Sequence, residues 1–387
     1  MKRENENEGI KILFKSYYFI YFIYVAATTY INIHFESIGI SASQIGLMTA
    51  VAKALAITAL PVWGMMSDYF EANKKILIFT ILGTLTFSLS FLLTKSFFII
   101  FILYSFFMIF SSSVVPLSDS LLLNHLDEKA EQYGQFRVWG SIGYMAGIIP
   151  FGWIIEQTQS EATFILAASG LFLSLFFAYK LPKSKRTIKV ASLGSFKLLF
   201  KNKDLLYFLV FTFLIQAPLT ANFVYFPIYF KSIGGGESLL GIGMFIAAGS
   251  ELVIFQKADI FLKKFKLKKV LLLSAVAFGI RWFLISIWTS PVLLLLTQLF
   301  HGLTYALFHV TAVSYISKLV GEKFRSTGQN LYASIISIST VASSLLGGMI
   351  YDGTGGAAMY ALGSAISLIA GFSYFYLLHK IEYGQKN

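Results

Sequence analysis

The sequence predicts an all-α membrane protein with twelve transmembrane helices. Of its 387 residues, 56% are hydrophobic and only 13% are charged, and the mean hydropathy is +0.71. The apolar residues form stretches of roughly 20 residues, long enough to cross a bilayer. Such stretches form helices, because a backbone in hydrocarbon must satisfy its own hydrogen bonds, and the alternating ten-residue strands of a barrel are not seen. A soluble enzyme is therefore excluded, and we expect no catalysis.

The apolar stretches follow one another with short connections. We place the twelve spans at 15–36, 42–63, 76–94, 97–121, 136–156, 161–180, 205–230, 238–260, 269–289, 291–316, 327–350 and 358–379. The mixed charges before the first span do not fit the basic start of a signal peptide, so we expect this helix to be retained.

Basic residues set the orientation of the spans. Most of the 31 lysine and arginine residues fall on the side that holds both termini, whereas Lys95 and Lys231 stand on the opposite side. The positive-inside rule therefore places both termini in the cytoplasm, with the protein in the plasma membrane. The longest connection, 181–204, is basic and central. It predicts a bundle at 1–180, a cytoplasmic linker at 181–204 and a second bundle at 205–387.

The two halves share an internal repeat. Phe35-Glu-Ser-Ile-Gly39 and Phe230-Lys-Ser-Ile-Gly234 both end the first helix of their half, and Gly46 and Gly241 follow at the same offset. This placement indicates a duplicated six-helix unit. Six plus six helices are typical of transporters that move two bundles about a central site.

Several chemistries are absent from the sequence. There is no cysteine, so disulfides and thiolate metal sites are excluded, and we expect no metal and no cofactor. No phosphate-binding loop occurs, which disfavours transport driven by ATP. The basic residues orient the helices, so we expect no nucleic-acid partner.

Several motifs together resemble the major facilitator superfamily. The second connection contains Gly64 and Asp68, similar to the loop signature of that superfamily, although Tyr69 replaces a basic residue. Further motifs are Pro116-Leu-Ser-Asp119, Tyr133-Gly-Gln-Phe-Arg137-Val-Trp139, Glu251, Arg281-Trp282, Gln298-Leu-Phe-His301-Gly-Leu-Thr304 and His309. These are similar to the branch that contains the lactose and phenylpropionate permeases.

The resemblance implies a major facilitator fold, with two pseudo-symmetric bundles and proton symport of a small organic solute. One departure affects the proton path. Lactose permease has an acid three residues after the histidine of helix 10, where this chain has Thr304, and its helix 8 acid lies about one turn from the place of Glu251.

Four ionisable residues fall near the middle of their spans. At a rise of ~1.5 Å per residue, Lys53, Glu251, Arg281 and His301 lie about 14–18 Å from a helix end. A charge at this depth costs roughly 2.5–3.5 kcal/mol, so such residues usually have partners or a function. Glu251 suits a reversible proton carrier influenced by Arg281. The alternative is an ion pair between them that only holds helices together.

Helix 10 carries a polar stripe. Gln298, His301, Tyr305 and His309 are spaced by three, four and four residues, which places them on one helix face. We interpret His301 and His309 as a proton relay and Gln298 as a substrate contact. The alternative is hydrogen bonding that only packs helices.

The first half supplies candidate substrate residues. On helix 1, Tyr21 and Tyr24 belong to a hydroxyl-bearing face, and the permease resemblance adds Asp119, Arg137 and Trp139. Asp119 and Arg137 could instead form a cytoplasmic gate, and the tyrosines could be plain packing. Lys53 has no obvious neutralising partner and suggests an anionic substrate. Bonding to a carbonyl or to Asp119 is the alternative.

We therefore expect a proton-coupled symporter that imports a small organic solute, such as an aromatic or other monocarboxylate, by alternating access. The alternatives are a sugar or nucleoside symporter, efflux by proton antiport, or a membrane sensor that does not transport. The expected partners are the solute, protons and the lipid bilayer, with a monomer as the working unit.

Overall fold

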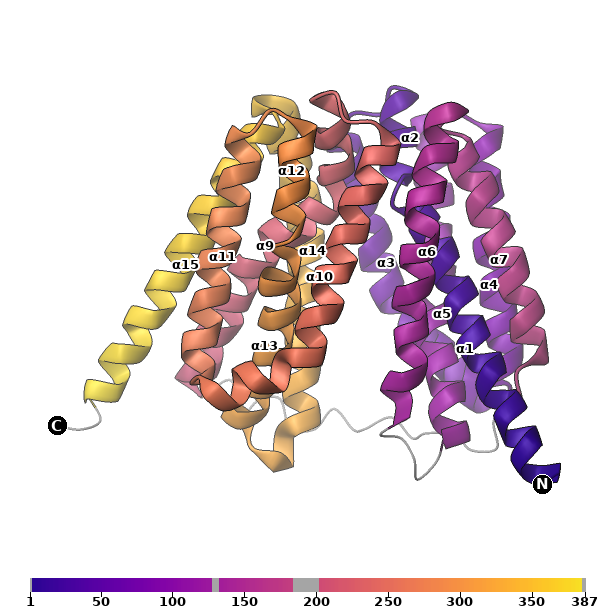
Figure 1. Ribbon diagram of the computed structural model, residues 1–387, viewed down its shortest axis with the longest axis horizontal. Coiled ribbons are helices and arrows are strands. Elements are labelled where there is room, and N and C mark those ends of the chain that lie inside the picture. The colour runs from indigo at the N-terminus through magenta and orange to yellow at the C-terminus, as the bar shows by residue number, and fades with distance from the viewer. Residues whose placement is uncertain (1, 127–131, 184–201, 385–387) are drawn as a thin grey trace. The chain divides into compact units, whose positions relative to one another are not determined.

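The computed structural model describes residues 2–126, 132–183 and 202–384. The described residues fold into helices, and none of them forms a strand (Figure 1). Among these described residues, twelve helical segments are long and apolar enough to cross a membrane. The predicted all-α class with twelve spans is confirmed.

In the first half of the chain, the residues that the structure describes form seven α-helices. They are α1 (Lys2–Thr28), α2 (Ile31–Ser37), α3 (Ala42–Tyr69), α4 (Asn73–Ser90), α5 (Phe97–Leu126), α6 (Tyr133–Gln157) and α7 (Ala162–Lys180). The first span consists of α1 and α2 together, because the helix breaks at Thr29 and Tyr30, which the apolar pattern did not predict.

The second half contains α9 to α15 and a π-helix, η3. They are α9 (Lys203–Ser232), α10 (Glu237–Lys264), α11 (Leu267–Ile287), α12 (Pro291–Gln298), η3 (Gly302–Ala306), α13 (Leu307–Val320), α14 (Arg325–Thr354) and α15 (Gly356–Gly384). The tenth span is thus three helical pieces in sequence, where the apolar stretch predicted one. The predicted linker at 181–204 lies largely outside the described residues.

The second connection is shorter than expected. Gly64 and Asp68, which we placed in a loop, lie in the last turns of α3, because that helix continues to Tyr69. Pro61 does not end the helix, since transmembrane helices tolerate proline inside them. The turn follows directly, and Glu71 adopts a φ of 48° there.

The chain divides into two compact units. Unit 1 comprises Met1–Ile40, Leu47–Val190 and Gly236–Ile242, and unit 2 comprises Ser41–Gly46, Ala191–Gly235 and Gly243–Asn387. In unit 1, α1 packs on α6 and α7, and α4 packs on α5 and α7. In unit 2, α9 packs on α14 and α15, and α11 packs on α13 and α15. The first turns of α3 and α10 therefore belong to a different unit from the rest of the same helix.

The repeated pentapeptides are helix C-caps. Gly39 and Gly234 both have a φ of 90°, and each amide N–H bonds to a carbonyl three residues earlier at 2.9 Å. The next residue, Ile40 or Gly235, donates to the carbonyl five residues earlier. This is the Schellman pattern, in which glycine takes a left-handed conformation that other residues rarely adopt. The repeat therefore marks where the first span of each half ends.

The second repeated feature is a carboxylate at the start of a helix. In unit 2, Asp352 accepts hydrogen bonds from the N–H groups of Ala42 and Ser43 at 3.1 and 2.8 Å. In unit 1, Glu156 accepts from the N–H of Ser238 at 2.8 Å. Both acids lie near the C-terminal end of their own helix, an unfavourable place for an anion. The exposed N–H groups of α3 and α10 compensate for it.

Two tyrosines complete these contacts. Tyr225 donates to the carbonyl of Ser344, and Tyr30 donates to that of Ile148 at 2.7 Å. A Cβ added to Gly46 would lie 2.2–2.3 Å from the carbonyl oxygen of Ser344 and the hydroxyl of Tyr225. A Cβ added to Gly241 would lie 2.7–2.8 Å from the carbonyl oxygen of Ile148 and the hydroxyl of Tyr30. The repeated glycines are thus positions where α3 and α10 closely approach a neighbouring helix.

We predict that Gly234→Ala lowers the free energy of unfolding by about 1–2 kcal/mol, because alanine is strained at this left-handed position. Thermal unfolding in detergent measures the change. Gly249→Ala is the matched control, since this glycine lies within α10 and a Cβ there meets no atom within 4 Å. Equal stability of the two variants would contradict the assigned role of Gly234.

Candidate functional site

The centre of the candidate site is Arg281 on α11, whose side chain is completely buried. One terminal nitrogen lies 3.0 Å from both His301 Nδ1 and Thr304 Oγ1. The other donates to Gln298 Oε1 at 2.9 Å. The guanidinium also lies over the ring of Trp282, with Cζ 4.9 Å from its centroid. The polar partners all come from the tenth span.

These partners are uncharged side chains. In the described part of the chain, no carboxylate forms an ion pair with Arg281. A buried charge is destabilising unless its donors are bonded, and hydrogen bonds to a charged group are worth about 1.5–3 kcal/mol each. Three neutral acceptors therefore hold the cation in place without cancelling its charge.

The contact between Arg281 and His301 fixes the histidine tautomer. A guanidinium only donates hydrogen bonds, so Nδ1 of His301 must be the acceptor, and a neutral ring then carries its proton on Nε2. This Nε2 lies 3.6 Å from Oε2 of Glu251 on α10. His301 therefore links a permanent cation on one side to a carboxylate on the other.

Aromatic rings continue from His301 along the tenth span. The ring of Tyr305 stacks on His301 at 5.3 Å, and His309 stacks on Tyr305 at 5.9 Å. Tyr332 on α14 follows, with its hydroxyl 3.3 Å from Nδ1 of His309. The three ring-bearing residues of the predicted polar stripe thus form a stacked column that begins at the Glu251–His301 pair, and the fourth, Gln298, bonds to Arg281.

The candidate residues of unit 2 all lie in one series of contacts. The pairing differs from the alternative in which Glu251 pairs with Arg281. Glu251 faces His301, so a Glu251–Arg281 ion pair that only holds helices together is not present. Thr304 was noted as a departure from the permease pattern, not as a candidate, yet it bonds to Arg281. Its spacing of three residues from His301 was the available signal.

In unit 1, Asp119 and Arg137 lie near each other on α5 and α6. Oδ1 of Asp119 accepts from the hydroxyl of Tyr18 at 2.6 Å and lies 3.9 Å from Nε of Arg137. Arg137 also lies over the ring of Phe22, 4.5 Å from its centroid. Tyr18 and Phe22 were not among the candidates, because nothing in their spacing separates them from other aromatic residues of α1.

The predicted aromatic residues of unit 1 divide into two groups. Tyr21 and Tyr24 are buried and lie next to each other, and Tyr17 stacks on Tyr21 at 6.1 Å. Trp139 is 37% exposed and contacts Phe19, so the structure does not bring it to the tyrosines. Gly64 and Asp68 both lie on α3.

Lys53 lies in the middle of α3 and is partly buried. Among the residues that the structure describes, none forms a hydrogen bond or ion pair with its ammonium group. The alternative of a carbonyl or Asp119 partner is therefore not seen, and Asp119 is bonded to Tyr18.

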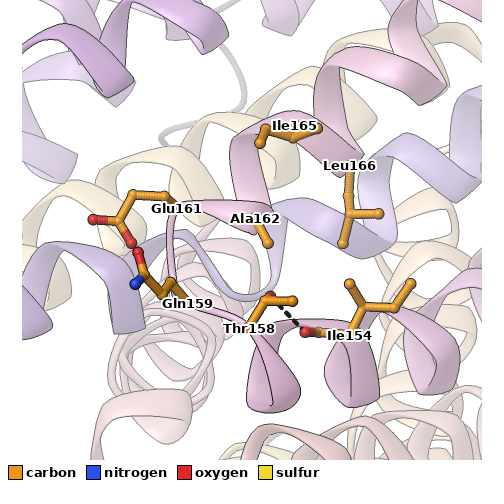
Figure 2. Close-up of a pocket in the computed structure, with 7 residues that line it drawn as sticks. All are labelled: Ile154, Thr158, Gln159, Glu161, Ala162, Ile165 and Leu166. Atoms are coloured by element: carbon orange, nitrogen blue, oxygen red, sulfur yellow. Dashed lines mark hydrogen bonds between the residues drawn. The ribbon is translucent and has the colours of Figure 1, made fainter.

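A separate hollow of about 450 Å³ lies at the turn between α6 and α7. Figure 2 shows Gln159 and Glu161 on one side and Ile154 and Leu166 on the other, and none of the lining residues is a candidate. Within the described residues, no three histidine, aspartate or glutamate side chains gather as a metal ion would require.

The model of the MFS_1 like family matches residues 11–362. The chain belongs to this family of major facilitator transporters. The resemblance seen in the motifs is confirmed, and membership of the MFS_1 like family establishes an integral membrane transporter.

Three curated relatives of this major facilitator protein cover most of its length. The uncharacterized transporter YwbF of Bacillus subtilis is 30% identical over 89% of this chain and 86% of its own. The maltose permease of Geobacillus stearothermophilus is 27% identical over 84% and 83%. The probable 3-phenylpropionic acid transporter of Escherichia coli is 22% identical over 94% and 91%.

Among solved structures, the nucleoside transporter NupG superposes with a TM-score of 0.83. It is 17% identical and covers 95% of this chain and 99% of its own. This likeness supports the major facilitator fold alone.

We predict that Thr304→Val lowers the free energy of unfolding by about 1–3 kcal/mol, because it removes an acceptor from the buried Arg281. Thermal unfolding checks this. Thr311→Val is the matched control, since Thr311 is buried on the same span but donates only to its own helix, at Leu307. A larger loss in the control would contradict the role of Thr304.

Proposed function

We propose that this protein is a proton-coupled symporter that imports a small organic solute by alternating access. The arrangement of Arg281, His301 and Glu251 is the observation that carries the proposal. A coupled transporter needs a group in the membrane that gains and loses a proton, beside a charge that senses the change. The basic cytoplasmic connections support a plasma-membrane protein with both termini in the cytoplasm.

Glu251 is the proposed proton carrier. While Arg281 occupies the Nδ1 lone pair of His301, the ring cannot take a second proton without breaking that bond. Glu251 is not bonded to Arg281 and has a carboxylate oxygen beside the Nε2 of His301. Its protonation removes the negative charge that faces the histidine. The cluster then carries the uncompensated charge of Arg281.

The stacked rings suggest the route of the proton. His309 and Tyr332 are the next titratable or hydroxyl-bearing groups after Tyr305 along the column. In our proposal the proton leaves Glu251 and reaches His309 when water or side-chain motion joins them, while His301 stays bonded to Arg281. Gln298 remains a substrate contact in this scheme, although its carbonyl oxygen is bonded to Arg281.

We propose a monocarboxylate as the first candidate substrate. Lys53 and Arg137 both belong to unit 1, and Lys53 lacks a described anionic partner. A carboxylate would supply the missing charge, while the hydroxyls of Tyr21 and Tyr24 and the carboxylate of Asp119 would contact the rest of the solute. A relative named as a probable 3-phenylpropionic acid transporter agrees with this class.

A sugar or nucleoside is the second candidate. The maltose permease is more similar to this chain than the 3-phenylpropionic acid relative is, and the fold matches a nucleoside transporter. The Asp119 carboxylate, which already accepts from the Tyr18 hydroxyl, would suit a sugar hydroxyl equally well.

We predict that Glu251→Gln abolishes proton-driven accumulation but preserves exchange of labelled solute across the membrane. Glutamine keeps the size and hydrogen bonding of the side chain but cannot ionise. Uptake against a gradient and counterflow in proteoliposomes separate the two activities. Persistent accumulation would show that Glu251 is not the carrier.

We predict that Lys53→Ser raises the half-saturation concentration for anionic solutes at least about tenfold, because it removes a charge-assisted hydrogen bond. Competition by matched carboxylates and their amides measures the selectivity. Lys257→Ser is the control, since Lys257 is exposed on α10. Equal weakening for charged and neutral solutes would leave Lys53 a structural residue.

A further inference from the structure

The tenth span is irregular where it meets Arg281. After α12 the backbone tightens, and the N–H groups of Leu299 and Phe300 donate to carbonyls three residues earlier. It then widens into the π-helix η3. A change from tight to wide turns needs a physical cause, and insertion of a side chain into the helical hydrogen bonds is one of them.

Ser250 of α10 supplies such a side chain. Its Oγ accepts from the N–H of Gly302 at 3.0 Å and lies 3.3 Å from the carbonyl oxygen of Gln298. In a regular α-helix, these two backbone groups pair with each other, four residues apart. The hydroxyl of a neighbouring helix therefore contacts both members of one helical pair.

The acceptor role of this hydroxyl is the specific one. A serine has a single hydroxyl hydrogen, and the carbonyl of Ala247 within α10, at 2.8 Å, is nearer than that of Gln298. The lone pairs of Oγ remain available to the N–H of Gly302. Ser250 thus holds a backbone donor of the tenth span from outside.

Gly302 permits this approach. A Cβ at residue 302 would lie 2.4 Å from the carbonyl oxygen of Ser250 and 2.8 Å from Cγ1 of Ile254. Backbone atoms cannot yield to such an overlap, so α10 and the irregular turn meet closely only because residue 302 has no side chain.

The same turn of α10 carries the proposed proton carrier. Glu251 follows Ser250 directly and lies 3.6 Å from His301, which precedes Gly302. We propose that Ser250 is a positioning residue that holds the irregular turn in register, so that Gln298 and His301 bond Arg281 while His301 stays within reach of Glu251. The chemical part of this inference rests on the proposed function. The structural part does not.

The pairing of a neutral and an ionisable contact has a mechanical consequence. The serine contact is unaffected when Glu251 gains or loses a proton, so it provides a fixed point about which the Glu251–His301 distance changes. If α10 moved, the Ser250 contact would move Gly302 with it. The partners of Arg281, which lie on the same span, would then change position as well.

Hydrogen–deuterium exchange tests the structural part, with the full-length protein in detergent or nanodiscs. Ser250→Ala removes the acceptor, and we expect peptides covering 298–306 to exchange at least about tenfold faster. Ser250→Thr keeps the hydroxyl and should restore slow exchange. Ser286→Ala is the control, because Ser286 bonds only to a carbonyl of its own helix, three residues earlier. Unchanged exchange in Ser250→Ala would overturn the proposal.

The transport readout separates a positioning role from general loosening. In Ser250→Ala, the pH midpoint of solute-driven proton uptake should shift by at least about 0.5 unit, and Ser250→Thr should return it. A uniform loss of rate with an unchanged midpoint would contradict positioning. If Glu251→Gln still accumulates solute while Ser250→Ala still exchanges faster, the proposed proton carrier fails and the structural role of Ser250 is supported.

Discussion

A guanidinium sits inside a membrane-spanning helical bundle, held by three side chains that carry no charge. Arg281 cannot lose its proton under ordinary conditions, so its neighbours must provide acceptors in fixed places. All three come from the tenth span. That span is therefore constrained to present Gln298, His301 and Thr304 toward α11, and the irregular backbone at η3 accompanies this requirement.

The remaining features of unit 2 follow from this constraint. Because Arg281 takes the Nδ1 lone pair of His301, the opposite nitrogen is directed to Glu251. The carboxylate is thus linked to the cation through a ring and not by direct contact, which is the arrangement on which the proposed proton carrier depends. The column from His301 to Tyr332 extends from the same pair. Unit 1 contributes a different chemistry, in which Asp119 is bonded to Tyr18 and Lys53 has no described partner.

Much of the fold was predictable, because each span must be long and apolar and the repeated pentapeptides are capping signals with a required glycine. The placement of Glu251, Arg281 and His301 within apolar spans was predictable for the same reason. Their pairing was not, since spacing along one helix does not tell which neighbour a long side chain reaches. Ser250 and Tyr18 left no sequence signal, as serine and tyrosine are frequent in every span. The breaks at Thr29 and after Gln298 were missed because the apolar stretch continues through them.

Proton movement that accompanies solute uptake is the most direct test of the proposed coupling. Purified protein in lightly buffered proteoliposomes, given monocarboxylates, sugars and nucleosides in turn, would be followed with a pH electrode and labelled solute. Proton-coupled symport predicts that the outer medium becomes more alkaline with one solute class and in proportion to its uptake. Uptake of a solute without any proton movement would contradict it.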